Sequence, residues 1–195
     1  MKRSQINGLI REGEAFFASR GFALPAWASW EPGRWRGSRA TASEIPTASL
    51  GWDITDFGSG DYPRRGLFLF TLRNGVLGSG GKTYAEKAMI VKVGQETPTH
   101  FHDYKMEDII NRGGGDLLIQ LWNSDEADGL ATTPVEVRID GILRRLPAAS
   151  TVRLGPGESI CLERRLYHRF WGEKETVLVG EVSMVNDDVG DNHFL

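Results

Sequence analysis

Two histidines, His100 and His102, are the residues of this sequence whose type and spacing most directly suggest chemistry. Side chains alternate between the faces of an extended strand, so both imidazoles project to one side, as do Lys105 and Glu107 after them. A third imidazole, His168, lies in a later strand candidate. Three imidazole nitrogens and one carboxylate oxygen suit Mn, Fe, Co, Ni, Cu or Zn, and open coordination positions could accept substrate oxygens. The His-x-His pair alone is also compatible with two exposed histidines that are unrelated to His168.

The composition indicates one folded domain. A chain of 195 residues with 40% hydrophobic and 25% charged residues can bury a sizeable core. Its 24 glycines follow no collagen-like period, which indicates many tight turns and favours an all-β fold. A net charge of −3 removes the general attraction that a basic domain has for nucleic acid or anionic lipid. We therefore expect neither a nucleic-acid partner nor a membrane partner.

The cysteine content and the hydropathy pattern predict a cytoplasmic protein. The single cysteine, Cys161, cannot form an internal disulfide, and the apolar run around it predicts a buried thiol. No apolar stretch reaches the ~18 residues that cross a bilayer, and no hydrophobic signal core follows the basic N-terminus. The sequence therefore favours a reducing compartment and gives no sign of export.

The elements that must position the histidines fall into two parts of one domain, residues 1–66 and residues 67–195. Apolar residues at helical spacing predict a helix over residues 4–20, with Ser4 as its N-cap and Gly21 at its end. The rest of the first part carries four prolines and four tryptophans, which predict an irregular segment that packs on the main core.

Short runs of β-branched and aromatic residues dominate from residue 67 onward. Asn74-Gly75 and Asp140-Gly141 follow two of these runs and are dipeptides favoured in tight hairpins. Eight or more strands without an intervening helical run predict an antiparallel β-barrel or jelly roll. The candidate strands are residues 67–72, 84–93, 105–110, 116–122, 135–139, 159–162, 167–171 and 176–185.

The spacing around the two histidines resembles the first sequence motif of the cupin superfamily. Gly94 is followed by five residues and His100-x-His102. Four residues then precede Glu107, and six more precede Gly114. The resemblance implies a cupin-type antiparallel barrel that carries a metal ion.

The second cupin motif is looser in this chain. A Gly155-Pro156-Gly157 turn and a strand candidate precede His168, but the spacing from the turn to the histidine is longer than usual. The departure concerns the geometry of the turn and leaves the candidate ligand in place. The resemblance implies four metal ligands: His100, His102, Glu107 and His168.

A closer resemblance, to the D-lyxose isomerase family, spans nearly the whole chain. The opening Met1 to Asn7 and the segment Gly21 to Pro25 are similar to that family. One departure is His193, where arginine is expected in many members, so a contact near the C-terminus is expected to differ. The runs that carry the resemblance most strongly are Gly51 to Gly58, Lys82 to Lys87, His100 to Gly115, Glu181 to Asp188 and Asp191 to Phe194.

The family resemblance implies an enzyme that converts D-lyxose to D-xylulose, and commonly D-mannose to D-fructose, with Mn²⁺ as the usual metal. Co²⁺, Fe²⁺, Ni²⁺ and Zn²⁺ stay open as alternatives. Such a reaction moves a proton between C1 and C2 through a cis-enediol. It needs a base for carbon, a proton source for oxygen and a stabilising cation. A neutral sugar agrees with the mild net charge.

Four further residues are candidates for catalysis and sugar binding. Lys105 shares a face with Glu107, where a bound cation would favour its neutral form and permit proton exchange. Glu181 lies in an otherwise apolar run and must face the cavity or find a partner. The family resemblance makes Glu181 the better candidate for the acid–base at carbon. Lys87 and Asp191 are candidate contacts of sugar hydroxyls, although Lys87 also fits a salt bridge and Asp191 a docked tail.

Two other functions and one assembly question stay open at this point. A cupin dioxygenase uses a very similar ligand set but consumes O₂. Its pocket is more often lined with apolar and aromatic groups, whereas the charged residues Lys87, Lys105 and Glu181 favour a polyol substrate. A non-catalytic sugar-binding cupin would lack an acid–base pair beside the metal. Cupins usually pair through sheet edges, so we expect a homodimer, with residues 27–52 as a candidate cover of the interface.

Overall fold

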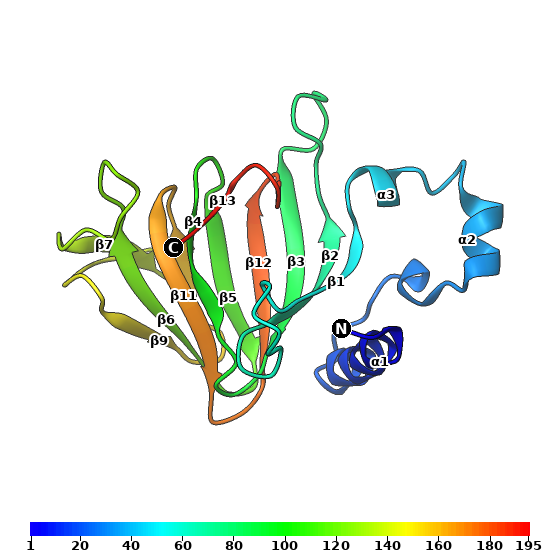
Figure 1. The fold of residues 1–195 in the computed structure, drawn as a ribbon, viewed down its shortest axis with the longest axis horizontal. Coiled ribbons are helices and arrows are strands. Elements are labelled where there is room, and N and C mark those ends of the chain that lie inside the picture. The colour runs from blue at the N-terminus through cyan, green and yellow to red at the C-terminus, as the bar shows by residue number, and fades with distance from the viewer.

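Thirteen β-strands carry the body of the protein, and the helices lie at its N-terminal end (Figure 1). This computed structural model describes residues 1–195. The helices are α1 (Arg3–Ser19), the 3₁₀ helix η1 (Ala26–Ser29), α2 (Pro32–Ser38) and α3 (Glu44–Thr47). The strands are β1 (Gly51–Thr55), β2 (Leu67–Arg73), β3 (Tyr84–Val91), β4 (Thr97–His102), β5 (Glu107–Gly113), β6 (Asp116–Asn123), β7 (Val135–Ile139), β8 (Ile142–Leu146), β9 (Thr151–Leu154), β10 (Ser159–Leu162), β11 (Leu166–Glu173), β12 (Val177–Met184) and β13 (Asn192–Phe194).

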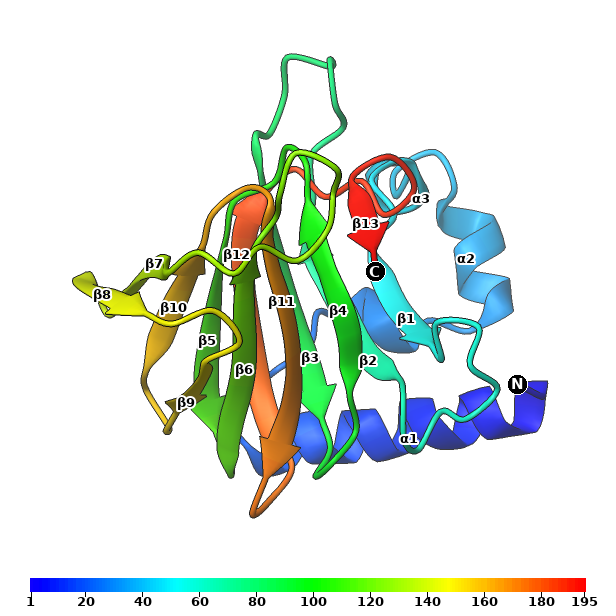
Figure 2. The same cartoon turned by 60° about the vertical axis from the view of Figure 1, so that its left-hand side comes forward.

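The strands form two sheets whose named strands all pair in antiparallel fashion. The larger sheet has the order β1-β2-β3-β12-β5-β10-β7-β8, and the smaller has the order β13-β4-β11-β6-β9. Figure 2 shows the two sheets facing each other, with α1 running across the base of the molecule. This arrangement confirms the expected cupin-type antiparallel barrel with an N-terminal helix. No helix of the structure has both the length and the apolar character needed to span a membrane.

The main hydrophobic core of 17 buried residues lies between the two sheets. Because alternate side chains of a strand share a face, Val177 and Val179 of β12 enter this core together. Glu181 is the next residue on that face and is also buried, with 4% of its surface exposed. The strand therefore carries a carboxylate inward at the point where the apolar core gives way to the polar site.

A second core on the outer face of the larger sheet holds the N-terminal part in place. Phe17 of α1 is fully buried against Phe68 and Phe70 of β2. The tryptophan-rich segment joins the same cluster through Trp27 and Trp52, whose rings lie within 5.0 Å and 4.7 Å of the Phe70 ring. This packing confirms that the segment docks on the barrel. It hides the apolar outer surface of β2 from water.

The predicted helix is present, with small differences at its start. It begins at Arg3, and Lys2 is the N-cap, where its backbone N–H donates to the Gln5 side chain at 2.8 Å. The Ser4 cap is therefore wrong, because Ser4 already lies inside the first turn. Gly21 follows the helix with a φ of +68°, a conformation that favours glycine, as predicted.

Residues 22–66 are more regular than their proline content indicates. They hold three short helices and β1, which pairs with β2 along Gly51 to Thr55. The expected strand at residues 105–110 begins at Glu107 instead, after a turn. The strand runs did not identify β4, β8, β9 or β13. These strands are short, exposed on one side or interrupted by residues such as Pro98, so local composition indicates them poorly.

The two predicted hairpin turns differ. Asp140 and Gly141 connect β7 to β8 directly, with φ values of 49° and 78°, as a two-residue turn requires. Asn74-Gly75 is not such a turn, because β2 ends at Arg73 and the next strand, β3, begins only at Tyr84. Gly75 is needed there for another reason: a Cβ would lie 2.0 Å from the carbonyl oxygen of Lys82.

Candidate metal centre and active site

Three histidines meet inside the barrel. His100 of β4 and His168 of β11 are direct partners across the antiparallel pair, and His102 lies two residues further along β4. All three are at least nine-tenths buried, and one ligand atom from each lies within 4.8 Å of the others. The register of β4 and β11, which pairs His168 with His100, therefore brings the third imidazole to the His-x-His pair. A cluster of this kind could hold a metal ion.

Hydrogen bonds orient two of the imidazoles. His100 Nδ1 lies 2.8 Å from the Pro98 carbonyl oxygen, and His168 Nδ1 lies 3.0 Å from the Leu166 carbonyl oxygen. A carbonyl only accepts, so each Nδ1 carries a proton, which leaves Nε2 as the nitrogen that a neutral ring offers to a metal. Burial lowers the pKa of His100 well below its usual value, and His168 and His102 add to this. The neutral imidazole is the form of histidine that binds a divalent metal.

The carboxylate of Glu107 completes the polar end of the cluster. Its Oε2 lies 3.5 Å from His102 Nε2, and its Oε1 lies 3.3 Å from His168 Nε2. Burial alone would raise the pKa of Glu107, but Lys105 and His102 outweigh this and hold it well below its usual range. The His168 Nε2 atom is buried without a hydrogen-bond partner. Such a donor set fits a divalent metal ion, and His100, His102 and His168 form a cluster that could hold one.

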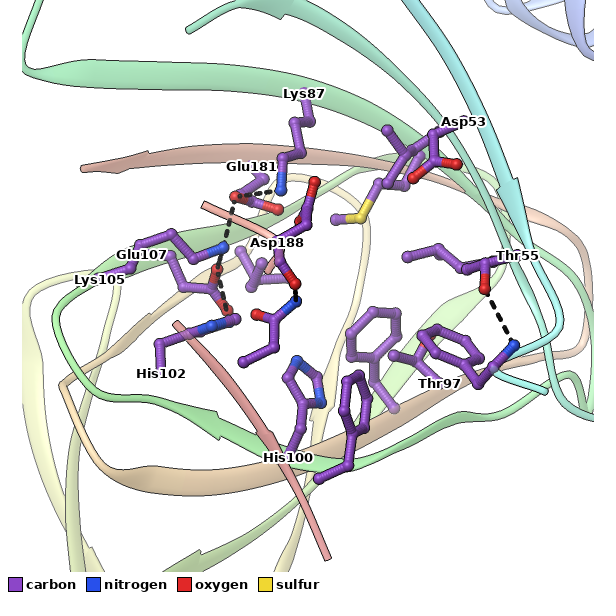
Figure 3. A pocket seen from close by; sticks show the side chains of 18 of the residues that line it. Asp53, Thr55, Lys87, Thr97, His100, His102, Lys105, Glu107, Glu181 and Asp188 are labelled. Atoms are coloured by element: carbon purple, nitrogen blue, oxygen red, sulfur yellow. Dashed lines mark hydrogen bonds and ion pairs between the residues drawn. The ribbon is translucent and has the colours of Figure 1, made fainter. Parts of the chain in front are cut away.

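Two lysines flank the carboxylate of Glu181 (Figure 3). Lys105 Nζ lies 3.1 Å and Lys87 Nζ 3.3 Å from the same oxygen, Oε1. Lys105 also contacts Glu107 Oε2 at 2.8 Å, so it links Glu181 to the histidine cluster. Lys87 stands opposite Glu181 in the register of β3 and β12. The cross-strand pairing thus brings Lys87 to the carboxylate, and the turn before β5 brings Lys105 to the same oxygen.

The surrounding charges keep Lys105 and Glu181 ionised. Burial alone would lower the pKa of Lys105, but Glu107 and Glu181 outweigh it, so the pKa is raised. Burial alone would raise the pKa of Glu181, whereas Lys105 and Lys87 reverse the effect and lower it. The residues of the chain thus favour the charged form of Lys105. The metal cation expected beside it would instead lower its pKa and favour the neutral form. Glu181 is a carboxylate at neutral pH and can accept a proton.

These groups line a cavity of about 370 Å³ between the two sheets. Cavities of this size hold small molecules in many proteins. One end carries His100, His102, Glu107 and Lys105, and Figure 3 shows Asp53, Thr55 and Thr97 at the other end. The lining is mixed, with these polar groups: Asp53, Thr55, Lys87, Thr97, His100, His102, Lys105, Glu107, Glu181, Asp188 and Asn192.

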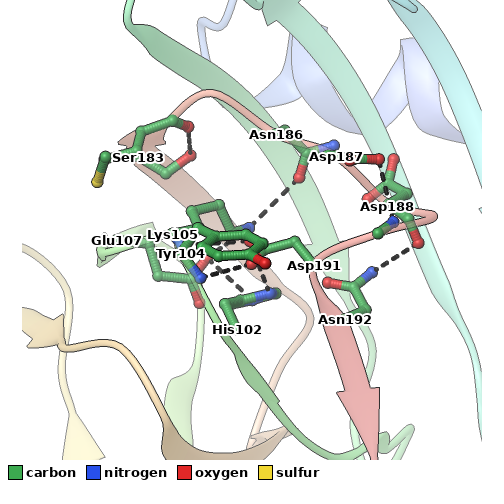
Figure 4. A network of polar contacts seen from close by, with 12 residues as sticks. His102, Tyr104, Lys105, Glu107, Ser183, Asn186, Asp187, Asp188, Asp191 and Asn192 are labelled. Carbon is green, nitrogen blue, oxygen red and sulfur yellow. Dashed lines mark hydrogen bonds and ion pairs between the residues drawn. The ribbon is translucent and has the colours of Figure 1, made fainter. Parts of the chain in front are cut away.

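Asp191 lies beside this cavity but does not line it. Its carboxylate accepts hydrogen bonds from the backbone N–H of Tyr104, at 2.6 Å, and of Lys105, at 3.2 Å. Its Oδ2 is also 3.8 Å from His102 Nδ1 (Figure 4). The residue is 2% exposed. These contacts tie the C-terminal segment to the turn that carries Lys105.

The C-terminal strand β13 pairs with β4, and two of its rings stack on rings of β4. Phe194 stacks on His100 with ring centroids 5.3 Å apart and lines the cavity. His193 stacks on Phe101 at 4.7 Å, with only 6° between the ring planes, and does not line the cavity. His193, where the family resemblance led us to expect arginine, therefore makes a packing contact.

The sequence did not point to two residues that contact the lysine–glutamate group, nor to five polar residues that line the cavity: Asp53, Thr55, Thr97, Asp188 and Asn192. Ser183 Oγ lies 3.0 Å from Glu181 Oε1, and Asn186 Oδ1 accepts hydrogen bonds from Lys87, at 2.5 Å, and Lys105, at 3.4 Å. Ser183 could have been identified, because it follows Glu181 by two positions on β12 and shares its face. No local pattern marks Asn186, which lies after the end of the strand.

The sequence comparisons identify relatives over the full length of the chain. Residues 1–195 match the family model described as D-lyxose isomerase. A D-lyxose/D-mannose isomerase of Serratia proteamaculans is 50% identical over 200 residues, and one of Escherichia coli O157:H7 is 49% identical over 200 residues. Each alignment covers 100% of this chain and 88% of the relative.

The solved structures agree on the fold. The L-ribose isomerase of Cellulomonas parahominis with L-ribose matches with a TM-score of 0.65 and 17% identity, over 100% of this chain and 92% of that one. The L-ribose isomerase of Geodermatophilus obscurus matches with a TM-score of 0.64 and 16% identity, over the same shares of the two chains. At this identity the likeness concerns the fold alone. From the match to the family model over every residue, and from relatives at half identity, this chain belongs to the D-lyxose isomerase family and is a sugar isomerase.

Proposed function

We propose that the protein interconverts D-lyxose and D-xylulose, and D-mannose and D-fructose, by metal-dependent proton transfer between C1 and C2. The observation that carries this proposal is the position of Glu181 and Lys105 beside the histidine cluster in one buried cavity. An acid–base pair next to a metal-binding group is what an enediol mechanism needs. The names of the two curated relatives, D-lyxose/D-mannose isomerase, support the choice of sugars.

The chain offers four ligands to a divalent ion. His100, His102 and His168 would hold it together with Glu107, and Mn²⁺ is the metal we propose. When bound, the ion supplies Lewis-acid polarisation of two adjacent sugar oxygens and stabilises the negative charge of the enediolate. Co²⁺, Fe²⁺, Ni²⁺ and Zn²⁺ suit the same donor set.

We assign the proton at carbon to Glu181. Its carboxylate removes the proton from C2 of the aldose, the C–H electrons form the C1–C2 double bond of the cis-enediol, and the C1=O π electrons move to O1. The protonated Glu181 then returns the proton to C1, which regenerates the carboxylate. Lys105 serves the oxygens: it donates a proton to O1 and receives one from the O2 hydroxyl. The cycle consumes no proton, and both side chains end in their starting forms.

Lys87 and Asp191 have supporting roles in this proposal. Lys87 lines the cavity and stays a predicted contact of the sugar hydroxyls, while its ion pair with Glu181 helps to keep that carboxylate charged. Asp191 stays a predicted sugar contact as well. Its bonds to the turn at Tyr104 and Lys105 support a second role, holding the segment that carries His102 and Lys105 in place.

A direct assay tests the function. The protein, loaded with Mn²⁺, is incubated with D-lyxose and with D-mannose while ketose formation and oxygen uptake are recorded. We expect ketose without oxygen uptake. Oxygen consumption would indicate a cupin dioxygenase, and binding of sugar without turnover would indicate a non-catalytic cupin. Family membership favours the isomerase over both.

Two further parts of the proposal concern assembly and location. The homodimer expected from the cupin resemblance would have twice the monomer mass of 21.6 kDa, and analytical ultracentrifugation would detect it. A cytoplasmic location agrees with the unpaired Cys161. A monomer at all protein concentrations would contradict the first of these predictions.

A further inference from the structure

Asn186 lies behind the two lysines that flank Glu181. Its Oδ1 accepts a hydrogen bond from Lys87 Nζ at 2.5 Å and one from Lys105 Nζ at 3.4 Å, and Figure 4 shows the second of these contacts. Asn186 itself does not line the cavity. A single amide oxygen outside the cavity lining therefore meets both ammonium groups.

Asn74, at the end of β2, holds Asn186 in turn. Its Nδ2 donates to the Asn186 carbonyl oxygen at 3.0 Å, and its Oδ1 accepts from the Asn186 N–H at 2.9 Å. The same Nδ2 also donates to the Ala48 carbonyl oxygen at 3.2 Å. Asn74 is 5% exposed, so both donors and the acceptor of its amide are used inside the protein. Asn74 thus binds both the N–H and the carbonyl group of Asn186 and fixes the backbone on both sides of its Cα atom.

The neighbouring glycine makes this clamp possible. A Cβ at Gly75 would lie 2.0 Å from the Lys82 carbonyl oxygen and 2.7 Å from the Val185 side chain. Only glycine therefore lets the chain pass so close to residue 185. The Asn74-Gly75 dipeptide thus joins the end of β2 to the segment after β12, where a hairpin turn was expected.

We propose that Asn74 and Asn186 are positioning residues of the isomerase reaction. Asn74 fixes the backbone at residue 186, and the Asn186 side chain holds the ammonium groups of Lys87 and Lys105 against one oxygen of Glu181. The inference rests on the proposed function, because the three residues that Asn186 arranges are those assigned to proton transfer and sugar binding.

The flexibility of lysine explains why such a residue is needed. A lysine side chain has four rotatable bonds, and its ammonium group can follow any nearby acceptor. Lys105 has a competing partner in Glu107 at 2.8 Å. Without the Asn186 oxygen, we expect Lys105 to keep its contact with Glu107 and to move away from Glu181, and Lys87 to move within the cavity. The proton-transfer geometry would then be lost, although the metal ligands stay in place.

The decisive variants are Asn186→Leu and Asn186→Asp, which have nearly the same size as asparagine. Leucine removes the acceptor, whereas aspartate keeps an oxygen at the Oδ1 position. We expect Asn186→Leu to lower kcat by about 10- to 100-fold, with KM for D-lyxose changed much less. Asn186→Asp should retain more of kcat than Asn186→Leu. Mn²⁺ content and melting temperature should stay near those of the wild type in both.

Asn123→Leu is the matched control. Asn123 is also half-buried and uses its amide for two bonds, to Thr133 and to the Pro134 carbonyl, but these lie outside the site. Its replacement should leave kcat unchanged. Asn74→Asp provides a second test: it keeps the acceptor for the Asn186 N–H and loses the two donated bonds. We expect a fall in kcat of the same kind with the metal content preserved.

The outcomes separate this inference from the proposed function. If the wild type converts neither D-lyxose nor D-mannose, the proposed function fails. If the wild type is active and Asn186→Leu matches its kcat, the positioning role is overturned. It is also overturned if the two Asn186 variants lose activity equally and in proportion to their loss of folded protein or bound Mn²⁺, because a merely structural residue would behave in that way.

Discussion

Lys105 Nζ lies 3.1 Å from Glu181 Oε1, although 76 positions separate the two residues and both are almost fully buried. The pair joins the turn before β5 to the middle of β12. Buried charges are unfavourable unless they are paired, and here each member also contacts a second group of opposite charge, Glu107 or Lys87. The arrangement keeps two ionised groups at the edge of a cavity, which is where a proton must be moved.

Glu181→Gln should abolish isomerisation while leaving metal binding intact. Glutamine has the shape of glutamate but cannot accept the proton from C2, so we expect kcat to fall by about 10²- to 10⁴-fold. Turnover of D-lyxose, exchange of the C2 proton with D₂O and Mn²⁺ content are measured on the same sample. Substantial turnover or exchange in this variant would remove Glu181 from the mechanism.

His102→Ala should lose metal and activity together. The variant removes one of the three converging imidazoles and leaves His100 and His168. His193→Ala is the control, because the fourth histidine stacks on Phe101 outside the cluster. Metal analysis after dialysis should show a deficit only in the first variant. Full Mn²⁺ occupancy of His102→Ala would contradict the ligand assignment.

Asp191→Asn should weaken metal binding without removing a ligand. The carboxylate lies 3.8 Å from His102 Nδ1 and accepts two backbone N–H groups of the following turn. Loss of a negative charge beside His102, on a residue that also holds the following turn, is expected to lower the affinity for Mn²⁺ by about 10- to 100-fold. Titration with Mn²⁺ measures the change. Asp187→Asn, in the same segment but bonded to Val189 and Gly190, should bind as the wild type does; equal affinity in both variants would refute the role of Asp191.

The sequence predicted the chemical groups of the site better than the contacts that hold them. The two-residue period of β4 and the apolar run around Glu181 mark inward-facing side chains locally, so the histidine pair and Glu181 could be identified. Asn74 and Asn186 are 112 positions apart, and their contact depends on how two loops meet. Local sequence cannot indicate such a contact. For the same reason Asn74-Gly75 resembled a hairpin turn, since its preference for tight turns is real but a tertiary contact overrides it.

Cys161 should react slowly with alkylating reagents in the folded protein. Burial and the nearby Asp108 raise the pKa of the thiol to about 11. Since a cysteine reacts as the thiolate, a pKa raised by two units lowers the reactive fraction by roughly 100-fold at pH 8. The rate of iodoacetamide modification should therefore keep rising up to about pH 11. Asp108→Asn should react faster than the wild type at pH 8, and an equal rate would exclude the effect of Asp108.

Two glycines of α1 offer a matched test of how the helix packs on the sheet. A Cβ at Gly13 would lie 2.4 Å from a ring carbon of Phe68, whereas a Cβ at Gly8 would have no neighbour within 4 Å. Alanine favours the helix by up to about 1 kcal/mol at either position, so Gly8→Ala should raise the free energy of unfolding. At Gly13 the collision with the buried ring opposes this gain, and we expect a net loss of about 1–3 kcal/mol. Urea unfolding of both variants, at one fixed Mn²⁺ concentration, measures the difference. Equal stabilisation by the two substitutions would show that α1 does not pack against Phe68 through Gly13.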